Sequence, residues 1–131
     1  GWIGVNFDGT LAEYHGSKGE DLLGAPIPLM VERVKMWLSA GVKVKIITAR
    51  VSYALERGPD SGVLSTRAFV SNQEQNIRAW CLAHLGQELE ITSVKDFHMI
   101  ELWDDRCICV QKNTGKAIKW APSGSNSINI L

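Results

Sequence analysis

Cysteine is scarce in this chain: it occurs three times among 131 residues, and the three form no recognisable set. Cys81, Cys107 and Cys109 are odd in number and include no C-x-x-C pair, which argues against a disulfide framework and favours reduced thiols. Cys107 and Cys109 could share one face of a strand, but no histidine or second cysteine pair accompanies them. A zinc site is therefore not expected.

An excess of charge of one sign is also absent, because fourteen basic residues balance fourteen acidic ones. No global field therefore attracts nucleic acid or an anionic membrane surface. No stretch approaches the ~18 consecutive apolar residues of a membrane-spanning helix, and no signal peptide is visible. We expect a cytoplasmic protein with no membrane partner.

Internal repeats and changes of composition that would mark a linker are lacking too. The length is that of one domain, since domains centre on roughly 100–150 residues. We expect a single domain over residues 1–121. Residues 122–131 are small and polar before a short apolar finish, and we interpret them as a loosely held tail.

Short apolar stretches alternate with helical patterns along the chain. Strands are expected at residues 2–5 and 42–47, and within the later stretches "LEITSVKD" and "MIELWDD". This alternation implies right-handed crossovers, and so an α/β fold with a mostly parallel sheet between two helical layers, a three-layer sandwich. Residues 107–111 and 116–120 flank Asn113-Thr114-Gly115, which predicts a C-terminal β-hairpin.

Two helices have recognisable ends. Pro28 suits the first position of a helix, where a missing N–H costs nothing, and Gly41 ends that helix. Ser71 and Glu74 form an S-x-x-E capping box, which predicts the start of a second helix ending at Gly86.

Polar side chains follow four of the expected strands where each strand ends. They are Asn6 and Asp8, Thr48 and Arg50, Lys95 and Asp96, and Asp104 and Asp105. In open parallel sheets, ligands bind beyond the carboxyl ends of the strands. We therefore expect these side chains to meet at one edge of the sheet.

The residue types at this edge suit phosphoryl chemistry. The Asp104-Asp105 pair offers the carboxylate oxygens that Mg²⁺ prefers. Thr48 can hydrogen-bond an anion, Lys95 can offset phosphate charge, and Asp8 can act as a general acid or base. Together they are the parts of metal-assisted phosphoryl transfer.

Each of these residues also has an ordinary structural explanation. An Asp-Asp pair is usually a turn, Lys95 is usually a solvated strand end, Thr48 could cap the next segment, and Asp8-Gly9 could be a common turn. Their occurrence in order at successive strand ends favours the functional interpretation.

Four segments resemble the motifs of the haloacid dehalogenase superfamily. "VNFDGTL" is similar to the first motif, Asp-x-Asp-Gly-Thr after an apolar strand, and "KIITAR" to the second. Lys95 fits the third-motif lysine, and "ELWDDR" fits the acidic fourth motif. The resemblance covers residues 2–110 and, because no large insertion is present, it is to capless or minimal-cap members. "GxPIPxMVERVKxWLxxG" followed by "TAR" resembles the phosphatase modules of phage-type polynucleotide kinases.

The resemblance implies a Rossmann-like fold and an Mg²⁺-dependent phosphatase that forms a covalent aspartyl-phosphate. The first-motif acid would attack phosphorus, and Asp8 would protonate the leaving group and later activate water. Thr48, Ala49 and Gly9 would contact the phosphate, and Lys95 would steady the nucleophile and the phosphate.

The same resemblance implies a metal site. Asp104, with Asp105 in support, would hold Mg²⁺ together with the side chain at position 6 and the backbone carbonyl of Asp8. Arg50 is not a general residue of the family, but two places beyond the second-motif threonine it could touch substrate.

Asn6 departs from the family pattern, since it stands where the nucleophilic aspartate is expected. An amide forms no normal acyl-phosphate, and loss of a covalent nucleophile can cost on the order of 10⁴–10⁶ in rate. We expect a catalytically impaired chain. An engineered aspartate-to-asparagine change is favoured over a natural pseudoenzyme, because the other motif residues are intact.

The open site suits a phosphorylated small molecule or a nucleic-acid end, and the sequence allows a homo-oligomer. Two alternatives belong to other classes: a non-catalytic module that binds Mg²⁺ and a phosphorylated ligand, and a flavodoxin-like receiver domain. A receiver places its acid pair after the first strand, so the late Asp104-Asp105 pair argues against the latter.

Overall fold

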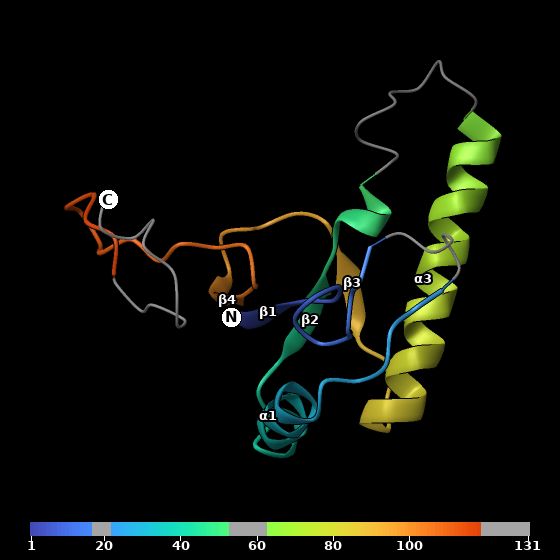
Figure 1. Cartoon of the computed structure of the whole chain (residues 1–131), viewed down its shortest axis with the longest axis horizontal. Coiled ribbons are helices and arrows are strands. Elements are labelled where there is room, and N and C mark those ends of the chain that lie inside the picture. Colours follow the sequence, from blue (N-terminus) through green and yellow to red (C-terminus); the bar gives the residue numbers. More distant parts are fainter. Residues whose placement is uncertain (17–21, 53–62, 119–131) are drawn as a thin grey trace.

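A computed structural model describes residues 1–16, 22–52 and 63–118 of the chain. It contains four strands and two helices longer than one turn (Figure 1). The strands are β1 (Trp2–Asn6), β2 (Val44–Ile47), β3 (Glu90–Thr92) and β4 (Met99–Trp103). The helices are α1 (Pro28–Ser39) and α3 (Val63–Leu85), and a short 3₁₀ turn, η1 (Ala49–Val51), follows β2. No helix in these ranges is long and apolar enough to cross a membrane.

All four strands are parallel and lie in the order β3-β2-β1-β4. β1 is therefore an inner strand, and Val5 lies opposite both Ile46 of β2 and Trp103 of β4. Trp2, Ile3, Gly4 and Val5 are all buried, so both faces of the strand are shielded from solvent, which explains why β1 is a continuous apolar run rather than an alternating one. The predicted α/β fold with a parallel sheet is confirmed at this level.

The core lies between one face of the sheet and the two helices. Ile3 and Val5 of β1 lie on the face of the sheet that the helices cover. The fully buried Phe7 packs edge-on against Trp80 of α3, with ring centroids 4.9 Å apart. From the helices the cluster takes Met30, Val31, Val34, Ile77, Trp80, Cys81 and Leu85. Burial in this cluster raises the pKa of Cys81 to about 12, which keeps its thiol protonated and inert.

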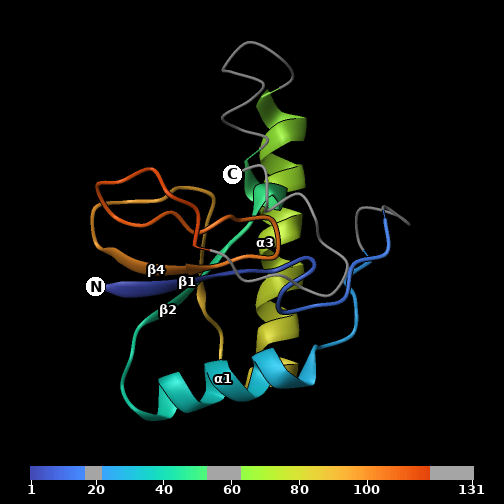
Figure 2. The same cartoon turned by 60° about the vertical axis from the view of Figure 1, so that its left-hand side comes forward.

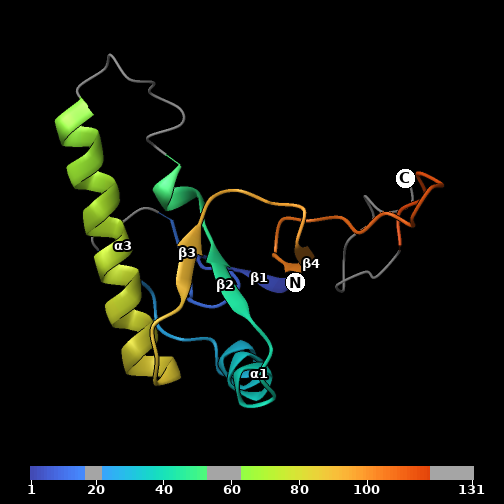
Figure 3. The same ribbon diagram turned by 180° about the vertical axis from the view of Figure 1, so that it is seen from behind.

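Both helices cover the same face of the sheet (Figures 2 and 3). The chain steps in one direction from β1 to β2 to β3, and two right-handed crossovers in one direction place their helices on one side. The return from β3 to β4 has to cross the opposite face, and residues 93–98 make this crossing without a helix. The expected second helical layer is therefore not formed by any described residue.

The crossing segment is anchored by a polar network on that opposite face. Trp2, only 2% exposed, donates a hydrogen bond from its indole Nε1 to Oδ1 of Asp96 at 2.9 Å. Lys45 lies over the Trp2 ring, 4.5 Å from its centroid, and within 3.8 Å of Asp96 and 3.4 Å of Glu90. The Trp2 hydrogen bond lowers the pKa of Asp96, with help from the His98 backbone and Lys45. Lys43 and then Lys45 lower the pKa of Glu90.

This network predicts a defined acid sensitivity. A carboxylate whose pKa is lowered by folding stabilises the native state above its unfolded pKa, and this stabilisation is lost as pH falls through the folded pKa. For Asp96 and Glu90, the loss is expected below about pH 4. Chemical unfolding followed from pH 6 to pH 2.5 should show a shallower acid decline for Asp96→Asn. Glu88→Gln, which removes a carboxylate outside the network, should keep the parental decline; equal slopes in both variants would contradict the assignment.

The first helix agrees with its prediction, and the second does not begin where expected. α1 begins at Pro28, and Gly41 just beyond its end has a φ of +80°, a conformation that a glycine adopts without strain. α3 already begins at Val63, so the predicted capping box at Ser71 and Glu74 is wrong. Inside the helix Glu74 pairs instead with Arg78, one turn later, at 3.6 Å.

The predicted C-terminal hairpin is reduced to one antiparallel bridge, between Val110 and Ala117, around the expected turn. The turn residue Asn113 has a φ of 65°, consistent with the predicted Asn-Thr-Gly signal. No strand forms on either side within the described residues. Residues 119–131, including the end of the second expected strand and the predicted tail, lie outside them.

Candidate functional site

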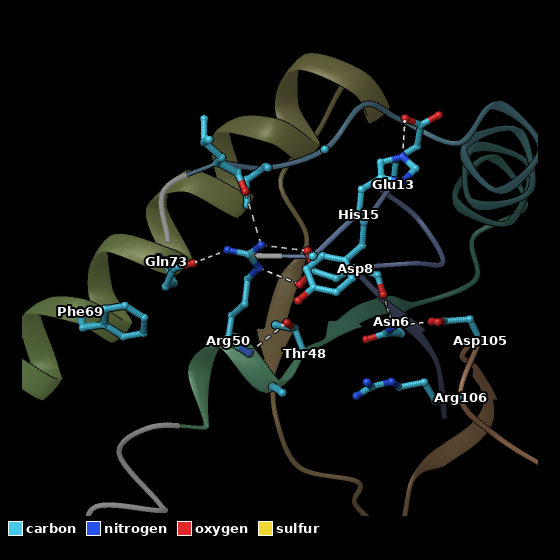
Figure 4. Close-up of a pocket in the computed structure, with 16 residues that line it drawn as sticks. Asn6, Asp8, Glu13, His15, Thr48, Arg50, Phe69, Gln73, Asp105 and Arg106 are labelled. Atoms are coloured by element: carbon cyan, nitrogen blue, oxygen red, sulfur yellow. Dashed lines mark hydrogen bonds and ion pairs between the residues drawn. The ribbon is translucent and has the colours of Figure 1, made fainter. Parts of the chain in front are cut away.

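A cavity of about 600 Å³ opens where the chain leaves β1 and β2, beside the turn that follows β4 (Figure 4). The chain continues from β1 to β2 and β3 on one side of β1, and then returns to place β4 on its other side. The strand order therefore reverses at β1, and such a switch point is the usual ligand crevice of a parallel sheet. The cavity is lined by Asn6, Asp8, Glu13, Tyr14, His15, Gly16, Leu22, Leu23, Gly24, Thr48, Ala49, Arg50, Phe69, Gln73, Asp105 and Arg106. Three of the four expected strand ends therefore meet here.

Asn6 stands at the centre of this site, at the end of β1. Its amide Nδ2 donates to the backbone carbonyl of Asp8 at 2.7 Å and to Oδ1 of Asp105 at 3.0 Å. Two oxygen acceptors from different parts of the chain thus converge on the side chain at position 6. An aspartate there would bring a third oxygen to the same point, with no donor between them.

Asp105 is held in this position by the loop that follows β1. Thr10 donates from Oγ1 to Oδ1 of Asp105 at 2.9 Å, and Oγ1 of Thr10 in turn accepts from the Asp105 backbone N–H at 3.0 Å. Gly9 has a φ of +88°, and a Cβ there would lie 2.6 Å from Oδ2 of Asp105. The Gly9-Thr10 sequence therefore both allows and fixes the close approach of this carboxylate.

Asp8 is engaged by Arg50 in a two-pronged ion pair. Arg50 donates from Nε to Oδ2 at 2.7 Å and from Nη2 to Oδ1 at 2.9 Å, and from Nη1 to Oε1 of Gln73 at 2.9 Å. The side chains of Arg50 and Asp8 are only 17% and 22% exposed, so solvent screens the pair weakly. Figure 4 shows Arg50 bridging Asp8 and α3 across the cavity wall. The arginine thus fixes the orientation of the carboxylate predicted to move protons.

Thr48 lies at the end of β2, almost fully buried, and its Oγ1 accepts from the backbone N–H of Arg50 at 3.2 Å. The hydroxyl proton stays available to an anion, since a hydroxyl both accepts and donates. Thr48 and Ala49 both line the cavity.

Two predicted residues lie elsewhere. Lys95 is exposed and is not among the residues that line the cavity. Asp104 does not line it either: its Oδ1 accepts from the backbone N–H of Arg106 at 2.8 Å. The acid expected in support, Asp105, is the one that meets Asn6. Burial, followed by the charges of Asp104 and Asp105, raises the pKa of the neighbouring Cys107, which makes that thiol a poor nucleophile.

Sequence reasoning assigned no role to Gln73 or Arg106, both of which line the cavity. Gln73 is 1% exposed in the middle of α3, and its contact with Arg50 gives this buried polar side chain a partner. Arg106 did carry a signal, since it directly follows the Asp104-Asp105 pair at the end of a strand.

The residues around position 6 that could hold a cation are few. The Asn6 amide nitrogen meets one carboxylate oxygen and one backbone carbonyl oxygen. The described ranges contain no group of three His, Cys, Asp or Glu side chains arranged for a metal. Oxygen donors from a carboxylate and a carbonyl are those that Mg²⁺ takes, with water completing its shell.

Comparison of the chain with protein-family models, with curated proteins and with solved structures gives no match. The residues of this cavity are therefore the basis on which function can be inferred.

Proposed function

We propose that this chain is the scaffold of an Mg²⁺-dependent phosphomonoester hydrolase of the haloacid dehalogenase type, with a Rossmann-like fold and with its nucleophile replaced by Asn6. One observation supports this most strongly. The Asn6 amide donates to two oxygens, those of Asp8 and Asp105, that would otherwise face an aspartate and a cation. On this proposal, Asn6 occupies the position of an acid and is held there by hydrogen bonds to both oxygens.

With an aspartate at position 6, hydrolysis of the phosphomonoester would proceed in two steps. Its carboxylate oxygen attacks phosphorus, and the bond from phosphorus to the leaving oxygen breaks as Asp8 gives that oxygen a proton. Water then attacks phosphorus of the acyl-phosphate and gives a proton back to Asp8. The bond between phosphorus and the oxygen at position 6 breaks, which releases phosphate and restores the carboxylate at position 6. Arg50 uses two lone pairs of the Asp8 carboxylate and leaves others for the proton.

The remaining roles follow the cavity lining. Thr48, Ala49 and Gly9 are proposed to contact phosphate oxygens. Mg²⁺ would be held by the side chain at position 6, the Asp8 carbonyl and Asp105, where it would neutralise phosphate charge. Asp104 is proposed to act through the turn that it holds.

A phosphorylated small molecule or a nucleic-acid end is proposed as substrate. The tyrosine Tyr14 and the α3 residue Phe69 line the same cavity and offer aromatic surface for a leaving group. The second candidate function, a non-catalytic module that binds Mg²⁺ and a phosphorylated ligand, is favoured by one fact, the presence of Asn6 itself.

Beryllium fluoride separates the two candidates. With Mg²⁺ it forms a stable phosphate mimic on an aspartate, because the carboxylate oxygen completes the shell of beryllium, and an amide does not support this. Asn6→Asp should give bound ¹⁹F NMR signals and a rise in Tm, as expected when a ligand binds only the folded state. The parent chain and an Asn6→Asp/Asp105→Asn variant should give neither. Absence of the adduct in a folded Asn6→Asp variant would leave the binding-module function.

A further inference from the structure

Arg106 is a cation of the cavity that makes no side-chain hydrogen bond or ion pair with any described residue. It lines the cavity with Asn6, Thr48 and Asp105, and only its backbone N–H is engaged, by Asp104. Figure 4 shows its side chain running past Asn6, on the opposite side of the site from the Arg50–Asp8 pair. Its five N–H donors are therefore open to a ligand.

The other cations near the cavity either pair with an acidic side chain or do not line the cavity. Arg50 is held by both oxygens of Asp8 and by Gln73. His15 lies 3.6 Å from Glu13 in an exposed pair. Lys95, the cation that the sequence pattern predicts for this role, does not line the cavity.

The charges of the lining require such a cation if the ligand is an anion. Asp8, Glu13 and Asp105 are acidic, and Arg50 balances Asp8 at close range. Mg²⁺ held by Asp105 would leave a single net positive charge on that side, which is less than a doubly charged phosphate needs. A guanidinium on that side supplies both the charge and a planar fork that matches two phosphate oxygens.

The backbone of Arg106 is held in place by hydrogen bonds of the turn that carries it. Asp104 accepts from the Arg106 backbone N–H, and Asp105 is tied to Thr10 on the β1 loop. The two consecutive aspartates thus have different roles. Asp105 faces Asn6, and Asp104 stabilises the turn that carries Arg106. A long side chain that starts from a fixed backbone loses less freedom when it binds.

We propose that Arg106 binds the non-bridging oxygens of the phosphoryl group, and that it, rather than Lys95, is the principal phosphate-binding cation of this site. The inference rests on the proposed function for the identity of the anion. It gives the segment "DDR" one continuous function: a carboxylate toward Asn6, a turn, and a cation toward the ligand.

The test is binding of inorganic phosphate, measured by calorimetry on the full chain with Mg²⁺ at about 0.15 M salt, where surface charges are well screened. Arg106→Gln should raise the Kd by roughly 10-fold or more, the usual value of a charge-assisted contact. Arg106→Lys should recover only part of the loss, because an ammonium lacks the fork. Lys112→Gln removes an exposed charge from the same C-terminal segment and should change the Kd by less than about twofold.

Three results would overturn the inference: no phosphate binding by the parent chain, an unchanged Kd in Arg106→Gln, or equal losses in Arg106→Gln and Lys112→Gln. A large loss in Lys95→Gln without one in Arg106→Gln would return the role to Lys95. The proposed hydrolase is judged separately, by the beryllium fluoride adduct of Asn6→Asp. An adduct with an Arg106-insensitive Kd removes only the inference. An Arg106-dependent Kd without an adduct removes only the hydrolase.

Discussion

Replacing Asn6 with aspartate is expected to raise Mg²⁺-dependent hydrolysis of an aryl phosphate by about 10⁴- to 10⁶-fold over the chain as it stands. The substitution restores a charged nucleophile at the end of β1, where Asp8 and Asp105 already present oxygens within hydrogen-bonding distance of the side chain. It also removes the N–H donor that now separates those oxygens. Without a metal the three oxygens would repel one another, so Mg²⁺ should both activate and stabilise the variant.

The measurement is release of the phenolate and of phosphate by both proteins, with Mg²⁺ and with chelator. Asn6→Asp/Asp105→Asn is the matched control, because it keeps the nucleophile and removes the carboxylate that Thr10 holds beside it. Its turnover should fall close to that of the parent. Equal, chelator-insensitive rates in all three proteins would contradict the proposed hydrolase, provided that each is folded by circular dichroism.

The second large effect is expected at Arg50. In the Asn6→Asp background, Arg50→Gln should lower kcat by about 10², the cost of a misplaced catalytic group. It should also lower the free energy of unfolding by about 1–3 kcal/mol, because Asp8 would lose both contacts while remaining largely shielded from water. Arg50→Lys should restore part of the stability but little of kcat, since a single ammonium does not fix both oxygens.

Turnover and urea unfolding of the same variants separate the two effects. Arg67→Gln is a suitable control, because it removes an exposed arginine from α3, the helix that carries Gln73. A purely structural role would lower stability and leave the pH profile of kcat unchanged. A role in positioning Asp8 should shift the profile as well. Turnover in Arg50→Gln equal to that of Asn6→Asp would contradict this assignment.

Local pattern was sufficient for much of the architecture. The apolar run of β1, Pro28 at the start of α1 and the order of strands and helices along the chain all follow from propensity and periodicity, which act over a few neighbouring residues. Once the strands were expected to be parallel, their ends had to lie at one edge, and the sequence therefore predicted that Asn6, Asp8 and Thr48 would meet there. The start of α3 was missed, since a capping box is a weak signal when the preceding residues can continue the helix.

Local sequence pattern could not predict which residues of the site contact one another. Asp104 and Asp105 are identical in chemistry and adjacent in sequence, and only the turn after β4, docked against Thr10, decides that Asp105 meets Asn6. The pairing of Arg50 with Asp8 joins residues 42 positions apart, and it depends on β1 and β2 being neighbours.

The sequence by itself determined the types of residue at the strand ends and the presence of an amide at position 6. The tertiary structure decided which of those residues face one another, that both helices cover one face of the sheet, and that Arg106 rather than Lys95 lines the cavity. The physical reason is that side-chain chemistry is a property of each residue, whereas distances across the sheet depend on strand order and on the turns that end each strand.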